Sequence, residues 1–257
     1  MKKILLTVAS LVLATGAFAQ GFGSRASNSD FYYQLGDSDF YLQPLADVHF
    51  GFDLATNATD EFKDNTSFFK STQFGFNMLE LSFRPYESGA ISLGADVEWN
   101  SYRLNSDYMF VPYNAIPTVA EPDGNKVSIQ NKTLMGIKEV KKSKLLVCTF
   151  EFPLNYTQKF GRFVIRLGAS AELNLQGCVQ FKGVGGVSGT DNIDEMGKGT
   201  RHSNQVSTNL FTYNLHGAIG YGGLGLYVKY RPKPVILENY GPQFQTLTLG
   251  LMIGLGF

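Results

Sequence analysis

The sequence predicts an all-β fold and, more narrowly, an eight-stranded antiparallel up-and-down transmembrane β-barrel with short periplasmic turns and long extracellular loops. Three observations predict it: the composition, a period of two in the apolar residues, and the alternation of short and long connections. The 257 residues include 28 glycines and 14% aromatic but only 17% charged residues, whereas soluble domains average about 25% charged residues. Such a chain is aromatic-rich and charge-poor, which favours β-structure over disorder.

Composition also excludes two classes of protein. Lys and Arg together number 22, as do Asp and Glu, so no net charge indicates a nucleic-acid partner. After the N-terminal segment, no apolar run reaches the ~20 residues that a membrane-spanning helix needs.

The first 19 residues have the three parts of a secretory signal peptide. Lys2 and Lys3 precede an apolar stretch over 4–13, and the small residues Ala17 and Ala19 follow it. We expect this peptide to be removed, with a retained N-terminal anchor as the alternative. The mature chain would then have an N-terminal periplasmic segment over 20–44 and a transmembrane β-barrel domain over 45–257.

Apolar and polar residues alternate with a period of two in several segments, which is the pattern of strands with two different faces. The clearest segments are 47–54, 91–100, 162–175 and 243–257, and the less regular ones are 72–84, 144–154, 208–220 and 224–231. Within 72–84 the apolar phase changes between Met78 and Leu79, which predicts a β-bulge. These are the eight expected strands.

Long and short connections alternate between these strands. The long ones are 55–71, 104–143, 177–206 and 232–243, and the short ones are 85–89, 155–160 and 221–223. Transmembrane barrels have short periplasmic turns at one rim and long extracellular loops at the other. The strands also reach the ~9–11 residues needed for a tilted crossing. We therefore predict a monomeric barrel located in the cell outer membrane.

Two cysteines in an exported chain raise the possibility of a disulfide. A hairpin turn near 155–160 would place Cys148 opposite residue 166, a dozen positions from Cys178. At ~3.3 Å per residue this offset exceeds disulfide reach. We expect two separate small apolar residues.

The polar face of each strand is expected to line the interior, because the apolar face of a transmembrane barrel contacts lipid. An eight-stranded barrel is just wide enough for its side chains to fill, so we predict a lumen plugged by ion pairs, in which Arg166 pairs with an acid such as Glu172, Asp96 or Glu98. The lumen-facing candidates are Asp47, His49, Asp53, Glu80, Arg84, Asp96, Glu98, Glu151, Arg162, Arg166, Glu172, His216, Lys229 and Arg231. The aromatic residues expected at the two rims are Trp99 and Tyr102 at one, and Phe160, Phe163 and Tyr221 at the other.

Motifs that carry chemistry in other proteins have a structural interpretation here. Gly220-x-Gly222-x-x-Gly225 matches a dinucleotide fingerprint, but that fingerprint needs a following helix, and here it joins two strands. Asp47, His49 and Asp53 are too widely spaced along one strand to bind one zinc ion. We expect no enzymatic activity, cofactor or metal.

Two further groups of residues are expected to meet other molecules. A group of basic residues is expected at the outer rim, where it would contact lipopolysaccharide phosphates or else form a solvated loop end. Its members are Lys138, Lys141, Lys142 and Lys144. Phe257 is the last residue of an alternating strand. A terminal Phe in this position resembles the signal that the outer-membrane assembly machinery recognises. The alternative is that Phe257 is merely the last lipid-facing aromatic residue.

The C-terminal half resembles PorT-like outer-membrane β-barrels, which are common in Bacteroidetes and similar in architecture to OmpA- and OmpX-type barrels. The resemblance rests on Lys144-Leu145 through Phe152-Pro153-Leu154, Asn209 through Tyr213, Gly220 through Tyr230, Pro234 and Gly241-Pro242. It is good over 144–257 and weaker over 45–103, and the 104–143 loop is particular to this chain. The resemblance implies the barrel and its location, and it carries no catalytic pattern.

The predicted function is that of a non-enzymatic outer-membrane protein whose long surface loops have a structural, adhesive or partner-binding role. Its expected partners are outer-membrane lipid or lipopolysaccharide, the assembly machinery and an unidentified extracellular ligand of the loops. The alternatives are a narrow channel for small solutes, a lipid-A-modifying enzyme that uses His49 or His216, and an accessory of secretion machinery. Only the family resemblance supports the last of these.

Overall fold

The protein is all-β and antiparallel in the computed structural model, which describes residues 33–35, 39–86, 88–112, 126–134, 137–185, 198–204 and 206–254. The predicted signal peptide and Phe257 lie outside these residues. The helical elements described are the single-turn helix α2 (Asp60–Lys63) and the 3-10 turn η1 (Phe68–Lys70). In this part of the chain no helix has the length and apolar character to span a membrane.

Thirteen strands are described. They are β1 (Tyr33–Gln34), β2 (Phe40–Pro44), β3 (Asp47–Thr56), β4 (Thr72–Tyr86), β5 (Gly89–Arg103), β6 (Tyr108–Pro112), β7 (Val127–Asn131), β8 (Ile137–Phe160), β9 (Phe163–Gly185), β10 (Lys198–Asn204), β11 (Phe211–Tyr221), β12 (Leu224–Arg231) and β13 (Gln245–Gly254).

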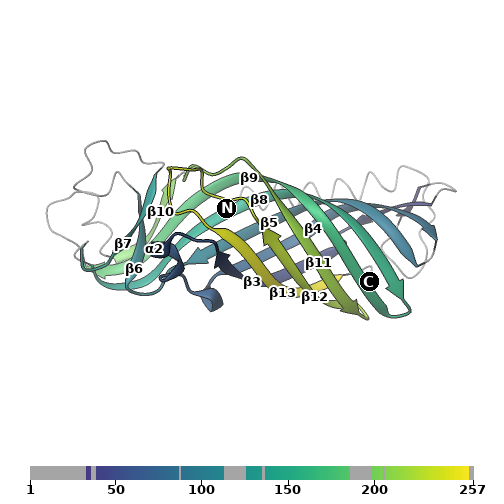
Figure 1. Ribbon diagram of the computed structural model, residues 1–257, viewed down its shortest axis with the longest axis horizontal. Helices are drawn as coiled ribbons and strands as arrows, with labels where there is room; N and C mark the ends of the chain where they lie inside the picture. The colour runs from purple at the N-terminus through teal and green to yellow at the C-terminus, as the bar shows by residue number, and fades with distance from the viewer. Residues whose placement is uncertain are drawn as a thin grey trace.

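Eleven of these strands form one sheet that returns on itself. The pairing runs β3–β13–β12–β11–β9–β8–β5–β4 and back to β3, and every pair is antiparallel. Each of the eight predicted strands lies in this ring-like sheet. Strands β1, β2 and β10 add to its edges, and β6 and β7 form a separate two-stranded sheet. The strands cross the long axis obliquely (Figure 1).

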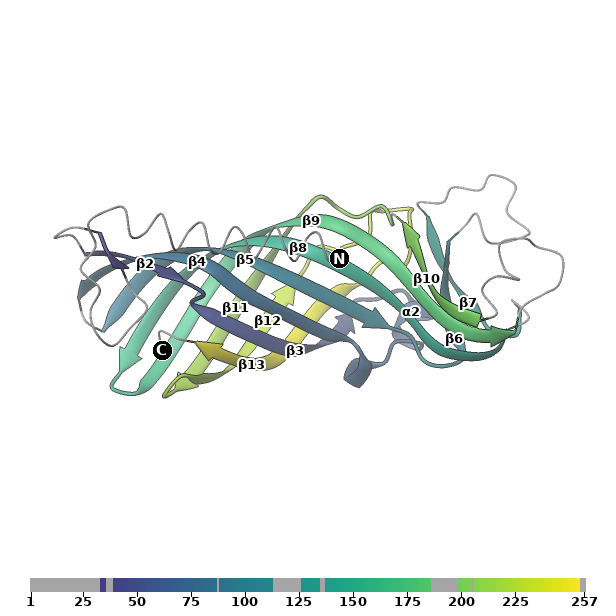
Figure 2. The same cartoon turned by 180° about the vertical axis from the view of Figure 1, so that it is seen from behind.

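The two ends of the ring differ in their connections. At the turn end, Phe160 and Phe163 are joined by a two-residue turn, as are Tyr221 and Leu224, and Tyr86 pairs with Gly89. Positive φ angles at Gly161, Gly222 and Gly223 allow these two turns, since glycine adopts φ > 0 without steric cost. The long connections gather at the opposite, loop end. Figure 2 shows β6, β7 and β10 there, with β8 and β9 reaching toward them.

The predicted ends of β8 and β9 are wrong. Instead of turning at 155–160, β8 continues to Phe160, and it begins at Ile137 rather than 144. β9 likewise extends to Gly185, into a predicted loop. Asn155 and Thr157 resemble turn residues in the sequence, but both are buried inward positions that alternate with the exposed Leu154 and Tyr156. The predicted loops 104–143 and 177–206 are correspondingly shorter.

The shifted hairpin also corrects the geometry expected for the cysteines. Cys148 lies opposite Gln176, and Cys178 lies opposite Leu146, so the two are separated by two positions rather than a dozen. Both are free. Diagonal neighbours of this kind have Cα atoms about 7–8 Å apart, beyond the usual disulfide range.

The predicted bulge in β4 is confirmed by a register shift against β5 between Asn77 and Leu79. On its other edge β4 pairs with β3 and then with β2. Leu45, with φ 52°, interrupts what is otherwise one extended path from Phe40 to Thr56. Residues 40–44 of the expected N-terminal segment are therefore part of the sheet.

Candidate functional site

The interior of the ring is polar, and this interior is the candidate site. Along β3, β11, β12 and β13, buried and exposed positions alternate strictly enough to separate two faces. Thr246 and Thr248 are buried, whereas Leu249 and Leu251 are exposed, as the sequence predicts. The described part of the chain buries seven carboxylates but three Lys or Arg side chains. These are Asp47, Asp53, Glu80, Asp96, Glu98, Glu151 and Glu172, against Arg166, Lys229 and Arg231.

Arg231 holds the part of this network nearest the loop end. Its Nε and Nη2 donate to the two oxygens of Glu172 at 2.7 and 2.8 Å. Its Nη2 also reaches Glu98 Oε1 at 3.2 Å, and Nη1 donates to the Tyr102 hydroxyl at 2.9 Å. Such a bidentate, charge-assisted contact is among the strongest that a side chain makes. Arg231 therefore joins β12 to β9 and β5 across the interior.

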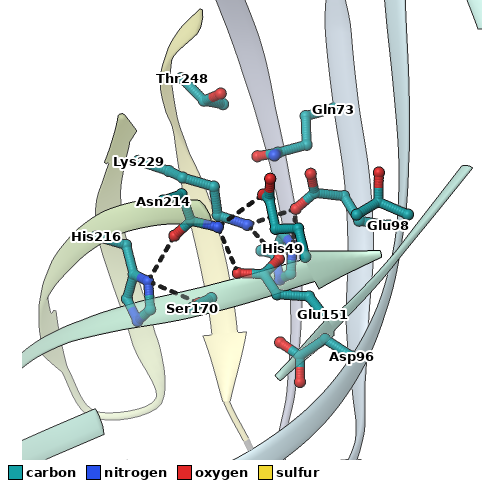
Figure 3. A network of polar contacts seen from close by, with 12 residues as sticks. His49, Gln73, Asp96, Glu98, Glu151, Ser170, Asn214, His216, Lys229 and Thr248 are labelled. Atoms are coloured by element: carbon teal, nitrogen blue, oxygen red, sulfur yellow. Dashed lines mark hydrogen bonds and ion pairs between the residues drawn. The ribbon is translucent and has the colours of Figure 1, made fainter. Parts of the chain in front are cut away.

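Lys229 lies two residues along β12 and joins two further carboxylates. Its Nζ donates to Glu98 Oε2 at 2.5 Å and to Glu151 Oε2 at 2.8 Å (Figure 3). Asn214 adds neutral donors, since its Nδ2 lies 2.8 Å from Glu151 and 2.7 Å from Glu172. Every partner here is buried.

The three glutamates Glu98, Glu151 and Glu172 converge closely enough to hold a metal ion, with one oxygen from each within 4.8 Å of the others. The cations of Lys229 and Arg231, however, already contact these oxygens. A divalent ion would have to displace them. The donor set therefore fits an internal ion-pair cluster better than a metal centre.

Arg166 holds the part of the interior nearest the turn end. Its Nη1 donates to Asp47 Oδ2 at 2.9 Å, and its Nη2 lies 3.8 Å from Glu80 Oε2. We expected its partner to be Glu172, Asp96 or Glu98, and this is wrong. The strand pattern gives the face on which each residue lies but not its height in the ring, and Asp47 comes from β3 on another part of the ring.

The two interior histidines have different surroundings. His49 Nδ1 lies 3.4 Å from Asp47 Oδ1, and its Nε2 lies 3.5 Å from Glu98 Oε2. His216 contacts neutral groups: Ser170 Oγ at 3.2 Å and Asn155 Oδ1 at 2.6 Å.

A glycine faces each imidazole from the neighbouring strand. Gly75 lies opposite His49, and Gly168 lies opposite His216. A Cβ at either glycine would come within 2.4 or 2.5 Å of the ring nitrogen. Any residue larger than glycine at position 75 or 168 would therefore fill space that a histidine ring now occupies.

A Ser170–His216 pair invites comparison with hydrolases, in which a histidine activates a serine. The cavity beside it, which Asp96, Arg166 and Tyr227 also line, measures about 30 Å³ as space open to the centre of a water molecule. One water needs about 10–15 Å³ by this measure. The cavity accommodates a few waters and has no room for an acyl chain.

Three further predicted residues, Asp53, Asp96 and Arg84, have neutral side chains among their partners. Asp53 accepts a hydrogen bond from Thr248 at 2.7 Å, and Asp96 accepts one from Asn77 at 2.7 Å. Arg84 is half-buried near the turn end, with its guanidinium 4.9 Å from the ring centre of Tyr41.

Two of the predicted positions are wrong. Arg162 is exposed in the β8–β9 turn, with its guanidinium 5.9 Å from the centre of the Tyr221 ring, because the strands extend to this turn. Tyr102, expected at the outer rim, is an inward position of β5 and is 1% exposed. It contacts Arg231 instead of an interface.

Sequence reasoning missed a hydrophobic cap over the loop end of the polar interior. Phe62 of α2 stacks on Phe244 at 4.1 Å between ring centres, and Phe244 packs edge-on against Tyr102 at 4.8 Å. The cluster also contains Leu104, Phe110, Val127, Ile129, Leu145, Val147, Val179, Val206, Val235 and Ile236. Because Tyr102 also bonds to Arg231, the apolar cap lies directly on the ion-pair network.

The neutral polar partners were also missed. Gln73, Asn77, Asn155, Thr212, Asn214 and Tyr227 all bond inside the ring. Their positions in the alternation carried the signal, since each occupies an inward place on its strand. The predicted interior residues are all charged residues or histidines, so these neutral residues were not among them.

Comparison of the chain with protein-family models and with curated proteins gives no match. The likeness to PorT-like barrels therefore stays a sequence-based expectation.

Loss of Arg166 should destabilise the turn-end part of the interior. Arg166→Leu removes the closer of the two described partners of the buried Asp47 and leaves His49 as the other, and we expect the free energy of unfolding to fall by about 1–3 kcal/mol. Urea unfolding of the folded protein in detergent measures this loss. Arg162→Leu, in the exposed β8–β9 turn, is the matched control, and an equal loss there would show that the Arg166–Asp47 contact has no special role.

Proposed function

We propose that this chain is an eight-stranded outer-membrane β-barrel protein with an occluded interior, without enzymatic activity, that serves a structural, adhesive or partner-binding role at the cell surface. The observation that carries the proposal is the inverted polarity of the ring. Ionisable side chains are buried inside, and large apolar side chains are exposed outside. Soluble monomers rarely expose contiguous apolar patches beyond a few hundred Å².

The exposed apolar side chains surround the ring rather than forming one patch. Leu93 on β5, Leu167 on β9 and Ile253 on β13 are 52%, 59% and 60% exposed. A face that binds a protein partner would lie on one side of the molecule. A bilayer covers all sides, and the lipid-facing band of such barrels has this composition.

Occlusion argues against the narrow-channel alternative. The central cavity and a second cavity at the turn end, lined by Glu80, Arg84 and Lys159, each measure about 30 Å³, and Arg166 lines both. Toward the loop end, the Arg231 cluster and the apolar cap fill the interior. We therefore propose that the interior carries no continuous water path between the two rims.

Export and assembly complete the proposal. The predicted signal peptide and the resemblance to PorT-like barrels support an outer-membrane location, where the chain would be a monomer inserted by the assembly machinery with Phe257 as its signal. With the interior filled, partner binding falls to the extracellular connections at the loop end.

Refolding tests the proposal. Diluted from urea into phospholipid vesicles, the protein should fold and migrate differently on gels when boiled and unboiled. In planar bilayers the folded protein should give no steady conductance, because the interior is plugged. Failure to fold into either vesicles or detergent would contradict the barrel, and stable single-channel steps would favour the channel alternative.

A further inference from the structure

Four cationic side chains gather on the outward face of three adjacent strands near the loop end. Arg103 of β5 lies opposite Lys144 of β8, and Lys142 of β8 lies opposite Lys182 of β9. Opposite residues lie about 5 Å apart, and Lys142 and Lys144 are about 7 Å apart along their strand. Arg103 and Lys144 each lie between two buried inward residues, and Lys142 and Lys182 each adjoin one. We call these four residues the basic cluster.

The basic cluster differs from the group expected from sequence. Lys142 and Lys144 belong to it, and β5 and β9 add Arg103 and Lys182. The side chain of Lys138 lies outside the described residues. Lys141 stands at a register shift in β8 and contributes its backbone carbonyl, which accepts a hydrogen bond from Arg103 Nη2 at 2.9 Å. Arg103 is thus anchored by the backbone and not by a carboxylate.

Like charges directly opposite each other on a sheet are destabilising, and this cluster contains two such pairs side by side. By register the nearest described acid is Glu139, which lies opposite Val184. None of the ion pairs between described side chains joins Glu139 to the cluster. The basic cluster therefore has the positive charge of an anion-binding site, and none of the described ion pairs neutralises it with an acidic side chain of the protein.

The height of the cluster on the barrel points to the kind of anion. Trp99, opposite Cys148, lies on the same outward face four residues closer to the turn end than Arg103. From there toward the turn end the outward face of β8 carries Phe152, Leu154 and Tyr156. Aromatic girdles mark the membrane interface, so the basic cluster would lie just beyond the bilayer core, at the level of lipid headgroups.

We propose that Arg103, Lys142, Lys144 and Lys182 bind the phosphate of a phosphorylated lipid of the outer leaflet. Arg presents paired donors that match phosphate, and Lys supplies point charges. The inference rests on the proposed membrane location, and it specifies which lipid chemistry the protein contacts.

The pKa of Lys144 agrees with this geometry. Lys144 lies beyond the segment proposed to span the bilayer. Partial burial, together with the neighbouring Lys142 and Arg103, lowers its pKa to about 8. A bound phosphate would offset this mutual repulsion.

The test is equilibrium binding to the full chain folded in zwitterionic detergent micelles. The probes are bis-phosphorylated lipid A, chemically dephosphorylated lipid A and inorganic phosphate. Binding is followed by the fluorescence of Trp99, the chain's one tryptophan. Lys142→Gln with Lys144→Gln should weaken binding of phosphorylated lipid A about tenfold or more, since each surface cation contributes about 1 kcal/mol.

The control variant removes two other cations, Lys63→Gln with Lys126→Gln, and should leave lipid binding unchanged. Equal affinity of the wild type for phosphorylated and dephosphorylated lipid A would overturn the proposal, because the acyl chains alone would then explain binding. Saturable binding of inorganic phosphate that matches lipid A in affinity would assign the cluster to a soluble anion instead.

Failure of the proposed function is separable from failure of the site. Each variant is checked for its boiled and unboiled gel mobility, so a loss of folding is not mistaken for a loss of binding. A wild type that binds phosphorylated lipid A in micelles but does not insert into vesicles would support the site and contradict the membrane location.

Discussion

Replacement of Arg231 by methionine is expected to lower the free energy of unfolding by about 3–5 kcal/mol, the loss typical of removing one partner from a buried ion pair. Arg231 is 2% exposed, and its guanidinium contacts Glu172, Glu98 and the Tyr102 hydroxyl. Methionine replaces the apolar stem of the arginine side chain and removes its charged head. What remains is an uncompensated carboxylate in a closed interior.

Urea unfolding in detergent micelles, followed by Trp99 fluorescence, measures the loss. Lys233→Met is the matched control, because Lys233 is exposed and its described contact is with the backbone oxygen of Phe211. It should cost less than about 0.5 kcal/mol. Adding Glu172→Gln to Arg231→Met removes the unpaired charge and keeps one acceptor oxygen for Asn214, while the Thr212 hydroxyl can accept a hydrogen bond from the new amide NH2.

The double variant should therefore be more stable than the sum of the two single losses predicts, as coupled partners are. Additivity would mean that the Arg231–Glu172 contact contributes little. If the double variant is more stable than that sum, the Arg231–Glu172 contact is the main link between β12 and β9 across the interior.

Strand faces could be predicted from the sequence because a period of two is a local property. The exposed Leu249, Leu251 and Ile253 and the buried Thr246 and Thr248 of β13 follow it without exception. So do the interior positions of Asp47, Glu98 and Lys229. A residue's face needs no knowledge of any other strand.

Register and contacts needed information that the sequence does not carry locally. Arg166 and Asp47 are separated by 119 positions, and their contact depends on the tilt of every strand between them. The cap is harder still. Phe62 comes from a four-residue helix and Phe244 from a long connection, where no periodicity marks an apolar residue as buried.

Leu167→Arg should destabilise the protein in a bilayer by about 2–4 kcal/mol, whereas Phe163→Arg on the same strand should cost about 0–1 kcal/mol. Both side chains lie on the outward face of β9 and are 59% and 50% exposed. They differ in depth. Phe163 begins the strand at the turn end, and Leu167 lies four residues farther in, among the outward apolar positions that end with Leu175.

Comparing the Leu167→Arg and Phe163→Arg variants distinguishes a lipid-facing surface from a water-facing one. On a surface exposed to water, the loss of stability would not depend on the position of the residue along the strand. On a soluble protein, either surface substitution would change stability by less than about 0.5 kcal/mol. Urea unfolding from phospholipid vesicles of both variants and the wild type gives the comparison. A cost at Leu167 that exceeds the cost at Phe163 by about 2 kcal/mol places Leu167 in the hydrocarbon. Equal small costs at both positions would mean that the apolar face of β9 meets water, and the proposed membrane location would then fail.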